Sequence, residues 1–92
     1  MKTLMYKGKP LAREGRQIYY GNPTDRVMLF MNILEAVPAK DGIEIATKVS
    51  VQIIKTDDEL SISERLVKQT EKNSLYQAFD IGTIWLEREL NK

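Results

Sequence analysis

The sequence predicts a single α+β domain over residues 1–92, in which an antiparallel β-meander of four to five strands is followed by two C-terminal helices packed on one sheet face. Three observations predict this class. Residues 43–53 alternate between apolar and polar side chains, which is the period of a half-buried strand. Residues 75–90 carry apolar side chains at helical spacing. Turn signals rich in glycine and proline divide the first half of the chain into short segments.

The N-terminal part is expected to form short extended segments at residues 4–6, 11–13 and 17–20. The phrases Lys7-Gly8-Lys9-Pro10 and Glu14-Gly15 separate these segments and have the composition of tight turns. Residues 21–25 (Gly-Asn-Pro-Thr-Asp) form a further turn signal.

A hairpin between residues 27–34 and 43–53 is the clearest long-range pairing in the sequence. Residues 38–42 end in Asp-Gly, which is a recognised hairpin signal. Residues 27–34 are apolar on both strand faces, with Asn32 as the only polar member. A strand of this kind belongs in the middle of a sheet that is covered on both sides.

Two helices are expected after the hairpin. Ser61 and Glu64 have the spacing of a capping box and predict a short helix that continues to about Lys72. The second helix spans residues 75–90. Its apolar stripe is expected to pack on the alternating face of residues 43–53 and includes Leu75, Phe79, Trp85 and Leu86.

Composition excludes several kinds of chemistry. The chain has no cysteine, so it has no disulfide, thiolate metal site or cysteine nucleophile. It also has no histidine, which removes the commonest general base and the Ser-His-Asp triad. No stretch has the roughly 20 apolar residues that span a bilayer. We therefore expect a cytoplasmic protein with no membrane partner, and we assign no catalytic, cofactor-binding or metal-binding residue.

Two local patterns have an ordinary structural interpretation. The acidic run at residues 57–59 lacks the spacing of a calcium loop and stands just before an expected helix, where acids are favoured by the helix dipole. The glycines of the N-terminal turns do not match a phosphate-binding loop, which needs several glycines, a lysine and a hydroxyl residue at fixed spacing.

The charge is unevenly distributed along the chain. Residues 1–26 have a net charge of +4 and residues 57–92 a net charge of −3, within a total of +1. Basic side chains with aromatic neighbours on a sheet can bind single-stranded nucleic acid. The candidate surface comprises Lys7, Lys9, Arg13, Arg16, Tyr19, Tyr20 and Arg26. Because Tyr19 and Tyr20 are adjacent in a strand, only one of them can face such a ligand.

The predicted sheet has more apolar residues than one layer of helices can cover. Two helices cover one sheet face, and a chain of 92 residues has little left for the other. A homodimer that buries this second face is the favoured explanation, and a monomer whose N-terminal strands cover the face is the alternative. The candidate subunit contact comprises Met28, Phe30, Ile81 and Ile84.

The leading functional hypothesis from the sequence is therefore a small cytoplasmic protein-interaction or assembly module that self-associates. Binding of single-stranded nucleic acid through the basic N-terminal sheet surface is the alternative. An enzyme that uses neither histidine nor cysteine is the least supported class, because no spacing singles out an acid–base pair.

Overall fold

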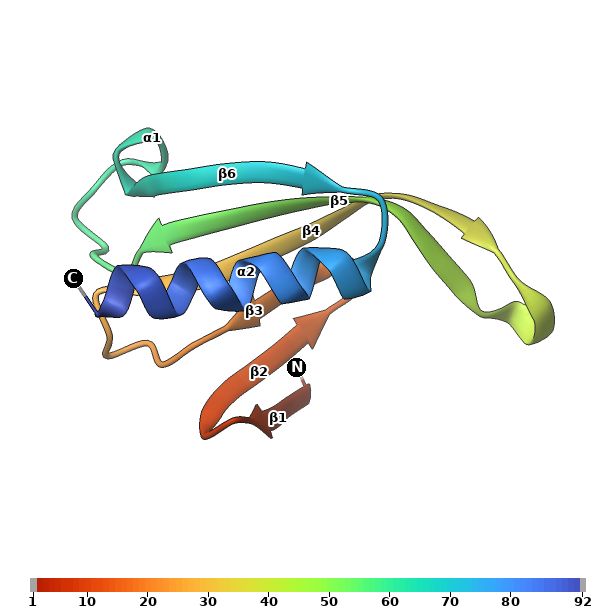
Figure 1. Cartoon of the computed structure of the whole chain (residues 1–92), viewed down its shortest axis with the longest axis horizontal. Helices are drawn as coiled ribbons and strands as arrows, with labels where there is room; N and C mark the ends of the chain where they lie inside the picture. Colours follow the sequence, from red (N-terminus) through yellow and green to blue (C-terminus); the bar gives the residue numbers. More distant parts are fainter. Residues whose placement is uncertain (1, 92) are drawn as a thin grey trace.

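The computed structural model describes residues 2–91, and its sheet follows the order of the chain. Six antiparallel strands lie in the order β1-β2-β3-β4-β5-β6 (Figure 1). The predicted α+β class and antiparallel meander are confirmed, with six strands in place of four to five. The strands are β1 (Lys2–Tyr6), β2 (Lys9–Glu14), β3 (Gln17–Tyr20), β4 (Val27–Pro38), β5 (Glu44–Lys55) and β6 (Leu66–Lys72). The helices are η1 (Lys40–Gly42, 3-10), α1 (Ile62–Arg65) and α2 (Leu75–Leu90).

The expected short helix up to Lys72 is wrong in its second half. Ser61 forms the predicted capping box with Glu64, but α1 has only four residues. Residues 66–72 form β6 instead and pair with β5, from Ile54 opposite Leu66 to Val49 opposite Lys72. A helix of about eleven residues is marginal in water. Pairing along the free edge of the long strand β5 satisfies the backbone of this segment instead.

The N-terminal strands are joined by two-residue turns. Lys7 and Gly8 both have positive φ, 49° and 80°, which is the conformation of a type I′ hairpin turn. Gly15 has a φ of 59° and begins the turn from β2 to β3. The primed turns match the right-handed twist of the strands, so the first three strands form a continuous meander.

The predicted hairpin of β4 and β5 is confirmed and its strands are longer than expected. Leu29 pairs with Ile53, Met31 with Val51 and Ile33 with Val49. The register is irregular between Ile33 and Ala36. Beyond this point, residues 34–46 project past the sheet as a two-stranded arm that ends in η1 (Figure 1).

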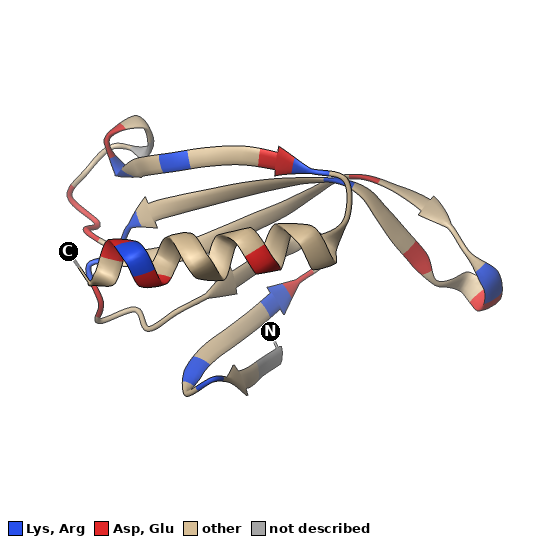
Figure 2. Cartoon of the chain, in the orientation of Figure 1, with Lys and Arg blue, Asp and Glu red and all other residues tan. Residues whose placement is uncertain are grey.

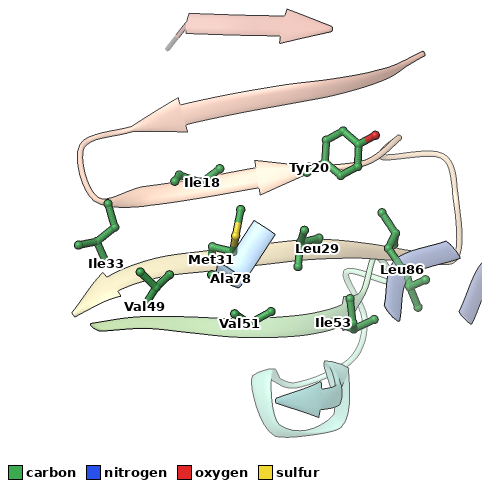
Figure 3. Close-up of a cluster of buried hydrophobic side chains, with 11 residues drawn as sticks. Ile18, Tyr20, Leu29, Met31, Ile33, Val49, Val51, Ile53, Ala78 and Leu86 are labelled. Atoms are coloured by element: carbon green, nitrogen blue, oxygen red, sulfur yellow. The ribbon is translucent and has the colours of Figure 1, made fainter. Parts of the chain in front are cut away.

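The hydrophobic core lies between the sheet and α2. Alternate residues of β3, β4 and β5 face the helix. The period of residues 43–53 predicted this correctly for Val49, Val51 and Ile53, whereas Ile43 and Ile45 lie in the arm and are exposed. The buried residues are Ile18, Tyr20, Val27, Leu29, Met31, Ile33, Val49, Val51, Ile53, Ala78 and Leu86 (Figure 3). The expected packing of Leu75, Phe79 and Trp85 against this cluster is confirmed.

Gly82 sets the distance between α2 and the sheet. It is buried in the middle of the helix, and a Cβ added to it would lie 2.6 Å from Cδ1 and 2.8 Å from Cδ2 of Leu29. Leu29 is itself fully buried, so it has little room to move. The helix therefore approaches β4 closely where glycine is present.

Candidate functional site

The face of the sheet opposite α2, hereafter the open face, is formed by side chains in three rows across the strands. Directly paired residues of antiparallel strands share a face, so the register defines these rows. The central row consists of Ala12, Tyr19, Phe30, Gln52 and Gln69. On one side of it lie Met28, Ile54 and Leu66. On the other side lie Glu14, Gln17, Asn32, Ser50 and Glu71.

The centre of the open face is apolar and aromatic. The rings of Tyr19 and Phe30 are 4.9 Å apart between centroids. Both are partly buried, as are Met28 and Ile54. Residues 17–20, 27–34 and 49–54 of β3, β4 and β5 carry no charged residue. The flanking strands β2 and β6 do carry charges, among them Arg13, Glu14, Lys68 and Glu71 (Figure 2).

Two hollows flank the Tyr19–Phe30 pair on the open face. One has a volume of about 660 Å³ and extends from Phe30 over Ile54 to Arg65 and Gln69. The other has a volume of about 430 Å³ and lies between Pro10, Pro23 and Met28. The rings of Tyr19 and Phe30 form a ridge between the two hollows. The open face therefore has a raised centre and depressions into which another protein surface can fit.

The four predicted subunit-contact residues lie on two opposite sides of the molecule. Met28 and Phe30 are on the open face. Ile81 and Ile84 belong to α2, where Ile81 packs partly against the core and Ile84 is 40% exposed. One isologous contact can include the first pair or the second, but not both.

The seven predicted nucleic-acid residues do not form one surface. As expected, Tyr19 and Tyr20 face opposite sides of the sheet. Tyr20 is buried under α2, and its hydroxyl donates to the carbonyl oxygen of Tyr6 at 2.8 Å. Burial raises the pKa of Tyr20 above its ordinary value, and the nearby Tyr6 and Glu87 raise it further.

Most of the basic members of that set have structural partners. Lys9 Nζ lies 3.5 Å from a carboxylate oxygen of Asp25, and Arg16 Nη2 lies 3.4 Å from Glu44 Oε2. Arg26 Nη2 donates to the carbonyl oxygens of Glu89 at 2.8 Å and Leu90 at 3.4 Å, where it satisfies the C-terminal end of α2. Lys7 lies in the β1–β2 turn, away from Arg13 at the other end of β2.

Arg13 stands on the helix side of the sheet and lines a cleft that sequence analysis missed. This helix-side cleft has a volume of about 490 Å³ and lies between the β1–β2 hairpin, β3, β4 and the start of α2. Its lining comprises Leu4, Leu11, Arg13, Ile18, Met31, Leu75, Tyr76 and Phe79. These residues come from five separate elements. No local pattern in the sequence places them together.

Metal-binding clusters, unsatisfied buried polar side chains and membrane-spanning helices are all absent from the part of the chain that the structure describes. Residues 2–91 contain no cluster of three or more acidic side chains that could hold a metal ion. No buried side-chain polar atom among them lacks a hydrogen-bond partner. No helix among them is long and apolar enough to cross a membrane.

Comparison of the chain with protein-family models, with curated proteins and with solved structures gives no match.

Proposed function

We propose that this protein is a small interaction module that self-associates through the open face of its sheet. The composition of that face is the observation that carries the proposal. The cores of protein interfaces are depleted in charge and enriched in aromatic residues and methionine. Tyr19, Phe30 and Met28 stand at the centre of the open face, with Gln52 rather than a charged residue beside Phe30.

The exposed area supports a partner of the size of a second copy. The chain exposes 6332 Å². Compact monomers of 10.6 kDa expose about 5500 Å² on the usual scaling with mass. The excess, roughly 850 Å², is close to the ~800 Å² that each partner buries in an interface of standard size. The uncovered sheet face and the projecting arm both contribute to this excess.

A second copy also fits the symmetry and shape of the face. Most small homo-oligomers are twofold dimers, in which the same patch meets itself. Two sheets pack face to face at about 10 Å with interdigitating side chains. The Tyr19–Phe30 ridge of one copy can then lie in a hollow beside the same ridge of the other.

The test compares the molar mass of three variants with that of the wild-type protein by sedimentation equilibrium. Phe30→Asp and Asn32→Lys each place a charge on the open face, and both should reduce the mass from about twice 10.6 kDa to the monomer value. Ile84→Asp is the matched control, because it places the same charge on an exposed position of α2. Its mass should equal that of the wild type.

Each variant is first checked for cooperative unfolding through the fluorescence of Trp85, the single tryptophan. If Phe30→Asp and Asn32→Lys fold and still have the dimer mass, the open face is not the contact. A lower mass for Ile84→Asp alone would move the contact to α2.

A further inference from the structure

We infer that the helix-side cleft binds a single-chain amphiphile with a carboxylate head, in which the acyl chain lies among the apolar residues and the carboxylate meets Arg13. This site lies on the opposite side of the sheet from the proposed subunit contact and does not depend on it. A volume of about 490 Å³ is within the range of small-molecule sites.

The lining of the cleft selects an apolar chain. Leu11, Ile18 and Met31 form its floor on β2, β3 and β4. Leu75, Tyr76 and Phe79 form one wall at the start of α2, and Leu4 forms the opposite wall. Leu4 is 56% exposed and Tyr76 87% exposed, although both are large apolar or aromatic residues beside a cleft. A bound acyl chain would cover this surface.

The charge of the cleft selects an anionic head. Arg13 is the only charged residue among the described side chains that line the cleft. Its Nε donates to the carbonyl oxygen of Gly15 at 3.1 Å, which holds the guanidinium at the rim. Within residues 2–91 it has no salt-bridge partner, whereas Arg16 and Arg65 each have one. A guanidinium with free Nη donors binds a carboxylate in bidentate fashion.

The start of α2 adds to the same preference. Leu75 and Tyr76 are the first two residues of a helix of sixteen and both line the cleft, so the positive end of the helix dipole lies beside it. Together, Arg13 and the start of α2 give the edge of the cleft a positive potential. A cationic amphiphile of the same length should therefore bind poorly.

The experiment titrates the full chain with octanoate, decanoate and dodecanoate below their micelle concentrations, by calorimetry and by the methyl NMR signals of Leu11, Ile18 and Met31. Saturable binding of one molecule per chain is expected. Affinity should rise roughly fourfold with each added methylene, which corresponds to about 0.8 kcal/mol. Decanol and decylamine should bind at least tenfold more weakly than decanoate.

Arg13→Gln separates the head from the chain. This substitution should lower the affinity for decanoate at least tenfold and leave the affinity for decanol unchanged. It should also leave the molar mass of the protein unchanged. Arg88→Gln is the matched control, because Arg88 is an exposed arginine at the far end of α2. Equal binding of decanoate to wild type and Arg13→Gln would overturn the proposal. So would absence of decanoate binding together with a change of molar mass in Arg13→Gln, which would make the cleft a contact between protein chains.

Discussion

Individual residues in this protein hold backbone conformations and contacts that local sequence only partly reveals. Asn22 illustrates the predictable kind, since its side-chain oxygen accepts hydrogen bonds from the backbone and hydroxyl of Thr24 within the expected turn. Arg26 illustrates the other kind. Its basic charge suggested a ligand surface, but its partners are carbonyl oxygens at residues 89 and 90, more than sixty positions away.

Lys7 carries a conformational cost that a substitution should remove. Its φ of 49° lies in the left-handed region, where asparagine is better tolerated than lysine. Lys7→Asn should raise the free energy of unfolding by up to about 1 kcal/mol, measured by urea denaturation. Lys7→Ala is the control, because it also loses the contact of Lys7 with the Tyr6 ring but keeps the strained geometry. A decrease for both variants would contradict this account of the turn.

Tyr20 should make the folded state sensitive to high pH. Its pKa is raised in the folded protein by burial, so the unfolded chain loses this proton first as pH rises above 10. The stabilisation is complete below pH 10 and is lost as pH rises through the raised pKa. Urea denaturation at pH 8, 10 and 11 should show a steeper loss for the wild type than for Tyr20→Phe. If the free energy of unfolding falls equally with pH in both proteins, the pH sensitivity does not come from Tyr20.

Secondary-structure elements were predicted well where periodicity was long and poorly where it was short. The alternation of residues 43–53 predicted a strand and its buried face at Val49, Val51 and Ile53, and the apolar stripe of residues 75–90 predicted α2 and its buried face. Ile43 and Ile45 belong to the same predicted face but are exposed in the arm. For residues 66–72 the capping box wrongly predicts a helix, because it indicates only where a helix starts. The free edge of β5, which decides their structure, is a tertiary feature that no local pattern contains.

The contact of α2 with β4 gives a direct test of the packing. Gly82→Ala places a methyl group against Leu29 and should cost about 1–3 kcal/mol, partly offset by a gain of about 1 kcal/mol in helix propensity. In a Leu29→Ala background the same substitution should be neutral or stabilising, because the space is then free. Thermal unfolding of the four proteins in this cycle measures the coupling. Additive changes in stability would show that Gly82 is not needed for the close approach of α2 to Leu29.

At the scale of the whole molecule, α2 covers one face of the sheet, and no helix or strand within residues 2–91 covers the other. The sequence predicted an apolar second face from residues 27–34, and the structure places Met28 and Phe30 there. It did not reveal the helix-side cleft, because that cleft depends on how the β1–β2 hairpin lies against α2. Tyr6 contacts both Tyr20 and Phe79 there, with ring centroids 5.8 and 5.0 Å apart.

The arm is the other large-scale feature that local patterns did not predict. Val37, Ile43 and Ile45 are exposed along it, beyond the N-terminal end of α2 (Figure 1). The molecule is correspondingly elongated, with extents of 42 × 25 × 23 Å. A strand extends only as far as its partner continues to pair with it. The arm therefore follows from the pairing of Val37 with Ile45 and not from either segment alone.

Self-association through the open face is the central claim, and the molar mass of the wild-type chain tests it most directly. Light scattering should give about twice 10.6 kDa at high protein concentration, with a decrease towards 10.6 kDa only on strong dilution. A mass of 10.6 kDa at every concentration up to the millimolar range would contradict the claim, because the apolar centre around Phe30 would then be exposed to water in the functional protein.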